Sequence, residues 1–283
     1  MTDVTAPGAP AELPALYASG RRKRQRSRRL RIASYVIGVA ILGSFVLFAD
    51  WGSISEEFFN IEVMREQFPD IITVAAKNTV LYTAMSYTGG VVIGVVVALL
   101  RLSPVKPYRA VALTYIEVLR GLPALVTIIL VGFVVPTVTK LQWPEPFGLN
   151  GGGVLALALV SGAYLAETVR AGIEAVPRGQ SEASRSLGLS SMQSMRFVVV
   201  PQAFRIVIPP LTNELVMLLK DTSLLSVLGA TIATKELLKF GQDVTAQSFN
   251  GSALVLASII YLLMTMSLTW VARRLEDRTR VYR

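Results

Sequence analysis

The chain contains no cysteine and no histidine in its 283 residues. These absences exclude disulfide bonds, thiol nucleophiles, serine–histidine–aspartate triads and zinc sites built from cysteine or histidine. Charged residues are also scarce, since they make up 17% of the chain, against about 25% in an average soluble domain. Hydrophobic residues account for 52%, and the mean hydropathy is +0.53. This composition indicates a membrane protein.

Six apolar runs are long enough to be bilayer-crossing helices, each of which takes about 20 mostly apolar residues. So many runs leave too little polar sequence to cover them in a soluble protein. The expected fold is therefore all-α, a polytopic membrane helix bundle with six transmembrane helices. The runs comprise residues 32–49, 79–100, 123–139, 154–172, 207–234 and 253–272.

The distribution of basic residues predicts the orientation of the bundle. Eight of them stand between Arg21 and Arg31, directly before the first run, and others follow the second, fourth and last runs. By the positive-inside rule, these connections and both termini face the cytoplasm. A nucleic-acid patch is the alternative interpretation of the basic stretch, but a span follows at once. Contact with anionic membrane lipid therefore explains it better, and no nucleic-acid partner is expected.

The connection between the fourth and fifth runs, residues 173–206, is too long for a simple turn. Pro177 and Gly179 are expected to end the incoming helix, and Gly188 to separate two short helices. The second of these is expected to stop before Pro201. The residues alone leave two interpretations open: a docking element for another protein, or an amphipathic hairpin on the lipid headgroups.

A motif in this connection resembles a known family. Glu182-Ala183-Ser184 is followed by three residues, Gly188, nine residues and Val198-Val199-Val200-Pro201. This resembles the EAA motif of bacterial ATP-binding-cassette importer permeases, with Ser at its third position and Val in place of Ile and Leu. Other segments resemble the permeases of polar amino acid importers. They include Asn78-Thr79, Arg120-Gly121-Leu122-Pro123, Gly162-Ala163-Tyr164-Leu165-Ala166-Glu167 and Leu218-Leu219-Lys220-Asp221-Thr222-Ser223-Leu224.

The resemblance implies a multi-pass subunit of the bacterial inner membrane with a five-helix permease core and one extra N-terminal helix. Its implied partners are ATPase subunits, a second permease copy or paralogue, and an extracytoplasmic solute-binding protein. The implied substrate is a polar amino acid: glutamine, glutamate, aspartate or a basic amino acid. The chain has no Gly-x-x-x-x-Gly-Lys-Ser/Thr phosphate loop, so ATP must be bound by the ATPase partner. We therefore expect no enzyme activity, catalytic residue, cofactor or metal in this chain.

The expected organisation follows from the runs and the resemblance together. It consists of a disordered basic cytoplasmic tail (1–31), the extra transmembrane helix (32–49), an acidic extracytoplasmic loop (50–70), the permease core (71–274) with its cytoplasmic coupling loop (173–206), and a second cytoplasmic tail (275–283).

The coupling loop supplies the first set of candidate site residues. Gly188 permits the positive φ that aims two short helices apart, and methionine tolerates a changing groove. Glu182 is expected to brace the loop through Arg178 or Arg185, in preference to pairing with an ATPase arginine. The residues expected to couple to the ATPase are Glu182, Ala183, Ser184, Gly188, Leu189, Met192 and Pro201.

The fifth run supplies the second set, because charges at membrane depth are costly and need an explanation. Glu214 and Asp221 share one helix face, about 10 Å apart along the axis. Pro209-Pro210 is expected to start this helix, so that free N–H groups beside Glu214 meet the substrate carboxylate. The residues expected in the substrate pathway are Asn213, Glu214, Asp221, Thr222 and Ser223.

Two alternatives remain open from the residues alone. Lys220 and Asp221 can instead pair with neighbours across a permease dimer, which is a structural role. An ion-gradient-driven secondary transporter or channel is the alternative function, and it would need no ATPase.

Overall fold

The computed structural model describes residues 13–280, all of them in helices or short connections, with no strand among them. The chain divides into two compact units, residues 1–55 and 56–283. The all-α, polytopic fold expected from the sequence is confirmed.

The first unit consists mainly of one long helix, α1 (Leu13–Phe48). Its part Leu30–Phe48 is long and apolar enough to cross a membrane. The helix ends beside Trp51, whose indole N–H donates to Val46 O at 2.7 Å. Residues 13–31 are helical, which corrects the expectation of a disordered tail there. The rest of that tail, residues 1–12, lies outside the described residues.

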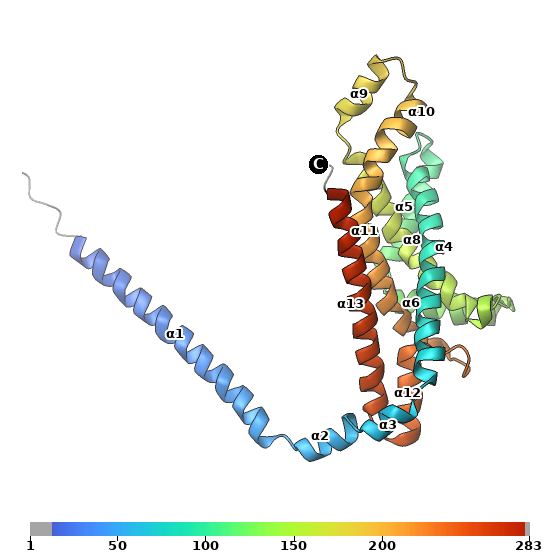
Figure 1. Ribbon diagram of the computed structural model, residues 1–283. Coiled ribbons are helices and arrows are strands. Elements are labelled where there is room, and N and C mark those ends of the chain that lie inside the picture. The colour runs from blue at the N-terminus through green and yellow to red at the C-terminus, as the bar shows by residue number, and fades with distance from the viewer. Residues whose placement is uncertain (1–12, 281–283) are drawn as a thin grey trace, which may run out of the picture. The chain divides into compact units, whose positions relative to one another are not determined.

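The second unit is a helix bundle (Figure 1). Its elements are the end of α2 (Trp51–Phe58), α3 (Ile61–Glu66), a π-helical turn (Ile71–Ala76), α4 (Lys77–Leu102), α5 (Lys106–Gly121), α6 (Ala124–Ile129), a second π-helical turn (Leu130–Val134), α7 (Val135–Thr139), a short 3₁₀ turn (Pro146–Gly148), α8 (Gly151–Glu174), α9 (Arg178–Ser186), α10 (Ser191–Ser194), a third π-helical turn (Met195–Val199), α11 (Val200–Asp221), a 3₁₀ helix (Thr222–Leu228), α12 (Leu237–Ser248) and α13 (Ser252–Arg280). One end of the bundle carries α9 and α10 and the other carries α3 and α12; we call them the α9 end and the α12 end.

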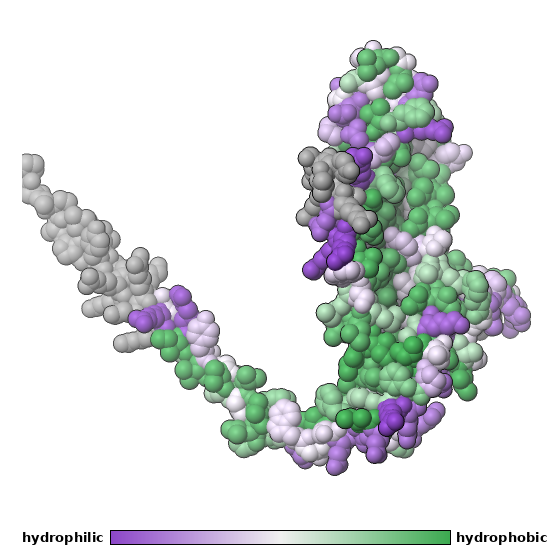
Figure 2. All heavy atoms as spheres, viewed as in Figure 1, coloured by the Kyte–Doolittle hydropathy of each residue, from purple (hydrophilic) through white to green (hydrophobic). Residues whose placement is uncertain are grey.

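Within residues 13–280, four helical segments are long and apolar enough to cross a membrane: Leu30–Phe48, Ile71–Leu102, Gly151–Glu174 and Ser252–Asp277. A fifth arises if α5 and the segment Ala124–Thr139 form one span bent by 108°. The break falls at Pro123, the N-cap of α6, as the expected span start there requires. The sixth expected span corresponds to α11, which is long enough but carries four charged residues. In Figure 2, hydrophobic residues dominate the visible flank, and hydrophilic residues gather near both ends.

The helices α4 and α8 pack closely because glycines face their neighbours. A Cβ atom at Gly90 would lie 2.1 Å from Ser161 Oγ, and one at Gly94 would lie 2.8 Å from Leu165 Cβ. Only a residue without a side chain permits such an approach. Both helices also contribute to an apolar core, which is formed by Tyr82, Ile128, Leu149, Ala156, Leu157, Leu218 and Leu225.

The fifth run differs from its expected bounds of 207–234. Helical structure is continuous from Ser191 to Asp221, so Pro201 does not end a helix and Pro209-Pro210 does not start one. The π-helical turn Met195–Val199 ends two residues before Pro201, which lacks the N–H of the normal helical hydrogen-bond pattern. The run then ends early, because the 3₁₀ helix and an irregular segment follow Asp221.

The acidic segment 50–70 is also more ordered than a loop. It contains α2 and α3, and its residues 56, 57 and 60 are fixed to the turn between α12 and α13 by three hydrogen bonds. Asn250 Nδ2 donates to Glu56 O at 2.8 Å, Gly251 N to Glu57 O at 2.7 Å and Asn60 N to Ser252 Oγ at 2.9 Å.

Candidate functional site

The α9 end carries an exposed apolar tip. Gly188 joins α9 to α10 with a φ of +91°, which L side chains rarely adopt, so the expected glycine turn is present. Around this turn, Leu187 is 86% exposed, Met192 76% and Phe197 62%. Leu189 is half-buried and Ala183 is exposed. An apolar surface at the end of a bundle is suited to a groove on a partner protein.

Serine side chains hold this tip together from inside. Ser184 is buried, and its hydroxyl lies 2.5 Å from Ser194 Oγ and donates to Ser181 O at 2.8 Å. Ser190 caps α10 in a reciprocal pair with Gln193. The third motif position, where this chain has Ser in place of Ala, therefore makes a specific bond between α9 and α10.

Two further coupling residues, Glu182 and Pro201, differ from expectation in their contacts and in their place in the helix. Glu182 is exposed, and in the described part of the chain it forms no ion pair with Arg178 or Arg185. The expected internal brace is therefore wrong, and the carboxylate is free to meet a partner. Pro201 lies in the first turn of α11.

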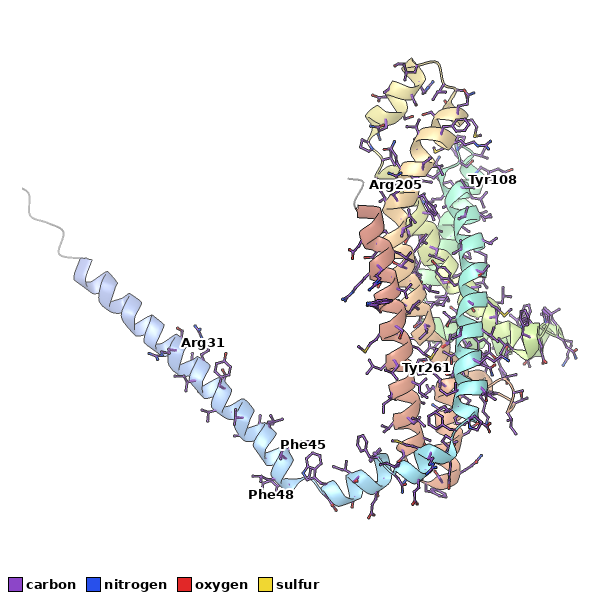
Figure 3. The ribbon with its side chains drawn as sticks, in the orientation of Figure 1. Arg31, Phe45, Phe48, Tyr108, Arg205 and Tyr261 are labelled. Carbon is purple, nitrogen blue, oxygen red and sulfur yellow. The ribbon has the colours of Figure 1, made fainter. Side chains whose placement is uncertain are left out.

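The tip stands on a packed apolar base. Val176, Val199 and Ala203 form a buried cluster that Ile173 and Ile206 cover. Below them, α8 and α11 approach closely at Gly172, where a Cβ atom would lie 2.0 Å from Val207 Cγ2. Arg205 and Tyr108 mark the same end of the bundle in Figure 3. The base connects the tip rigidly to α8 and α11.

The expected pathway residues lie on α11 and on the 3₁₀ helix that follows it, and they differ in exposure. Asn213 is exposed, and Glu214 and Asp221 are half-buried. Ser223 lines a groove of about 460 Å³ between the end of α11 and α13, together with Lys220. The side chains of Asn213, Glu214, Asp221 and Ser223 are therefore accessible to a solute in the single chain. Thr222 is fully buried, which corrects its expected pathway role.

The prolines give a further correction. Because Pro209 and Pro210 lie inside α11, no helix N-terminus with free N–H groups adjoins Glu214. The expected backbone site for a substrate carboxylate is therefore wrong at this position. Glu214 and Asp221 retain only their side chains for contact with a solute.

A buried polar network at the α12 end was missed by the sequence reasoning. Glu236 is 2% exposed, and its carboxylate accepts hydrogen bonds from Leu238 N, Lys239 N and Tyr261 Oη at 2.6–2.7 Å. Tyr261 Oη also lies 3.3 Å from Thr222 Oγ1. Figure 3 shows Tyr261 on α13 in the half of the bundle nearer the α12 end. Thr222 thus has a structural partner, which explains its burial.

Asn78 adds to this network from α4. Its side-chain amide donates to Ala233 O at 2.7 Å and to Lys235 O at 2.9 Å. The Asn78-Thr79 pair was one of the segments that resemble the permease family. The N-cap role of Glu236 was not predictable, because glutamate is not among the favoured N-cap residues.

Burial and ion pairs shift the pKa values of two carboxylates at α12. Burial raises the pKa of Glu236, although the three donors oppose the shift. Burial also acts to raise the pKa of Asp243, but its ion pairs with Lys235 at 2.6 Å and Lys239 at 2.8 Å lower it overall. Within residues 13–280, no group of three or more acidic side chains is placed to hold a metal ion.

Comparisons with known proteins agree with this architecture. The family described as "Binding-protein-dependent transport system inner membrane component" matches residues 90–281. The L-cystine transport system permease protein TcyB of Bacillus subtilis (strain 168) is 32% identical over 219 residues, 77% of this chain and 90% of the relative. The glutamine transport system permease protein GlnP of Escherichia coli (strain K12) is 33% identical over 207 residues, 73% of this chain and 91% of the relative.

A solved structure is similar as well. The crystal structure of an amino acid ABC transporter with histidines has a TM-score of 0.70 and 33% identity, and the match covers 77% of this chain and 98% of the other. The chain therefore belongs to the family of inner-membrane components of binding-protein-dependent transport systems. Within that class it is similar to amino acid permeases of ATP-binding-cassette importers, so the resemblance seen in the sequence is confirmed. Members of this family are transport components and not enzymes.

Proposed function

We propose that the chain is the transmembrane permease subunit of an ATP-driven importer of polar amino acids such as glutamine, glutamate, aspartate or a basic amino acid. The names of its relatives, which concern glutamine and L-cystine, support this substrate class. In this proposal the α9 end and both termini face the cytoplasm, in accord with the basic connections. An external solute-binding protein approaches the α12 end, and a second permease copy or paralogue completes the pathway.

The observation that carries the proposal is the tip formed by α9 and α10. An exposed Leu187 and Met192 flank a glycine turn on a rigid base, and Glu182 is free beside them. Such a tip fits a groove on an ATPase subunit and transmits its movement to α11. A hairpin lying on lipid headgroups would not need the fixed serine contacts between α9 and α10.

Reconstitution in liposomes tests the mode of energy supply. The permease, its ATPase and its binding protein should take up the amino acid only with internal ATP. Uptake that survives without ATP and collapses when a proton or sodium gradient is dissipated would show the alternative, a secondary transporter.

The coupling tip is tested by Gly188→Asp and Glu182→Lys. The first variant strains the positive-φ turn, and the second reverses the free charge, so both should release or uncouple the ATPase while the permease still inserts. Ser186→Ala is a matched control, because Ser186 is exposed on the same helix. Normal copurification and transport-coupled hydrolysis in both variants would contradict the assignment.

The pathway proposal keeps Asn213, Glu214, Asp221 and Ser223. The two half-buried carboxylates lie on the helix that the tip moves, and they can meet the ammonium group of an amino acid. Glu214→Gln and Asp221→Asn should change uptake rate or preference and leave ATPase binding intact. Unaltered transport kinetics in both variants would assign these carboxylates a structural role.

The N-terminal basic stretch between Arg21 and Arg31 completes the proposal. Because it immediately precedes the span Leu30–Phe48, it lies where anionic lipid headgroups gather.

A further inference from the structure

A cavity of about 900 Å³ lies where α7, the following connection and the start of α8 meet. This part of the bundle forms an arm that projects sideways from it (Figure 1), and hydrophilic residues cover the arm's outer end (Figure 2). The volume is in the range of small-molecule sites, roughly 300–1,000 Å³. Residues lining the cavity include Thr137, Lys140, Gln142, Trp143, Glu145 and Asn150.

The cavity wall holds one cationic and one anionic side chain. Lys140 and Glu145 both line it, and both are exposed. Neither forms an ion pair with another residue of the described chain. Each charge is therefore available to a ligand. A free α-amino acid presents one carboxylate and one ammonium group, which is the complementary pair of charges.

The backbone around these two residues is held in place before any ligand arrives. Trp143 Nε1 donates to Val131 O at 2.9 Å, which fixes the indole as an apolar wall. A Cβ atom at Gly152 would lie 2.6 Å from Trp143 Cδ1, and one at Gly151 would lie 1.8 Å from Pro144 O. The glycines at the start of α8 thus let the connection lie directly against the helix. Such fixed geometry reduces the ordering cost of binding.

Contacts of Asn150 fix the position of α8 beside the cavity. Its backbone N–H donates to Tyr82 Oη at 2.9 Å, and its side chain accepts from Gly153 N at 2.9 Å. As the N-cap of a 24-residue helix, Asn150 places the positive end of the helix dipole at the cavity wall. This dipole acts in the same sense as Lys140 and favours a ligand carboxylate.

The cavity adjoins the proposed pathway. Glu145 and Asn150 also line a smaller cavity of about 170 Å³ together with Gly229, Ala230, Thr231 and Thr234. Those residues follow the 3₁₀ helix that continues α11. Gly132, which lines the large cavity, packs against Leu228 of that helix, whose Cδ1 would lie 2.6 Å from an added Cβ atom. The large cavity therefore adjoins the 3₁₀ helix that follows α11.

We propose that this cavity is a reception site for a free α-amino acid, whose carboxylate binds Lys140 and whose ammonium group binds Glu145. Its place ahead of the α11 pathway rests on the proposed function, whereas the binding itself does not. A polar side chain on the ligand, such as an amide, can reach Gln142 and Thr137.

The chain offers its own reporter for this site. It has three tryptophans, so replacing Trp51 and Trp270 by Phe leaves Trp143 as the sole tryptophan, in the cavity wall. In the full-length permease in lipid nanodiscs, L-glutamine should change the Trp143 emission with a saturable titration. Lys140→Gln and Glu145→Gln should each weaken this response at least tenfold. Lys77→Gln and Glu66→Gln, exposed residues elsewhere, are the matched controls and should leave it unchanged.

Ligand analogues separate the two contacts. N-acetylglutamine lacks the ammonium group, so its weaker binding should no longer respond to Glu145→Gln. Glutamine amide lacks the carboxylate, so its binding should no longer respond to Lys140→Gln. A structural role for either residue would lower binding of every analogue alike.

The outcomes distinguish this inference from the proposed function. If glutamine leaves the Trp143 emission unchanged, or both charge variants bind normally, the reception site is refuted even when ATP-driven uptake is present. An emission that responds only to permease concentration would show that a second copy fills the cavity, and would also refute the site. Saturable, charge-dependent binding without ATP-driven uptake would support the site and refute the proposed function.

Discussion

The close approach of α8 and α11 at Gly172 yields a quantitative prediction about the base of the coupling tip. A methyl group placed on Gly172 would lie 2.0 Å from Val207 Cγ2. Valine in a helix has one strongly preferred χ1 rotamer, so the methyl of Val207 cannot turn away at low cost. Overpacking of this kind costs about 1–3 kcal/mol. Replacing glycine by alanine in a helix also stabilises the helix, by up to about 1 kcal/mol.

The steric cost should prevail, and Gly172→Ala should destabilise the permease by about 1–2 kcal/mol. For a chain of this size, that corresponds to a fall in Tm of about 2–8 °C. Thermal unfolding of the detergent-solubilised permease measures it. Gly179→Ala is the matched control, because a methyl group there meets nothing within 4 Å. It should leave the Tm unchanged or raise it.

A compensating substitution makes the reasoning refutable. In the double variant with Val207→Ala, the new methyl would lie 3.5 Å from the remaining Cβ atom of residue 207, an ordinary contact. Val207→Ala alone should cost about 1–3 kcal/mol through its cavity. The double variant should be more stable than the sum of the two losses by about 1–2 kcal/mol. Strict additivity, or a Gly172→Ala variant as stable as Gly179→Ala, would refute the close packing of α8 and α11.

Other expectations concern the tip and the network around α12. Gly188→Ala should weaken ATPase binding, because alanine meets the strain of the positive φ and adds no charge; copurification of a normal amount of ATPase with this variant would argue against a conformational cause. Tyr261→Phe leaves the buried Glu236 carboxylate without one donor and should destabilise the permease by about 1–3 kcal/mol, whereas an unchanged Tm would remove the network from the stabilising contacts. Asp243→Asn should cost stability above the ordinary aspartate pKa of about 4, and this cost should disappear as the pH falls through the lowered pKa of the ion-paired carboxylate; a loss independent of pH in thermal melts would contradict this.

The sequence predicted those features whose signal lies in a few neighbouring residues. Apolar length identified α4, α8 and α13, and Pro123 marked the break before α6 because proline stands naturally at a helix start. The glycine turn at Gly188 and the exposed apolar tip were predictable for the same reason. The all-α helix bundle followed from these local patterns, and the sixth expected span, at α11, stays a prediction.

Features that depend on distant contacts were not predictable in the same way. The prolines of α11 appeared to bound a helix, but a π-helical turn and packing against α8 maintain the helix through them. Thr222 appeared to be a pathway residue, but Tyr261, 39 positions later, encloses its hydroxyl. Glu236 gave no pattern, since its partners come from α12 and α13 and only the fold brings them together.

The uninterrupted helical segment from Ser191 to Asp221 has a mechanical consequence. Val207, where this segment rests against Gly172, divides it into parts of about 24 Å toward the tip and about 21 Å toward Asp221, at 1.5 Å per residue. Pro209 and Pro210 follow this contact directly and remove two backbone donors from the helix, so bending is easiest there. A displacement of the tip therefore reaches the arm that carries Asp221 through this pair of prolines.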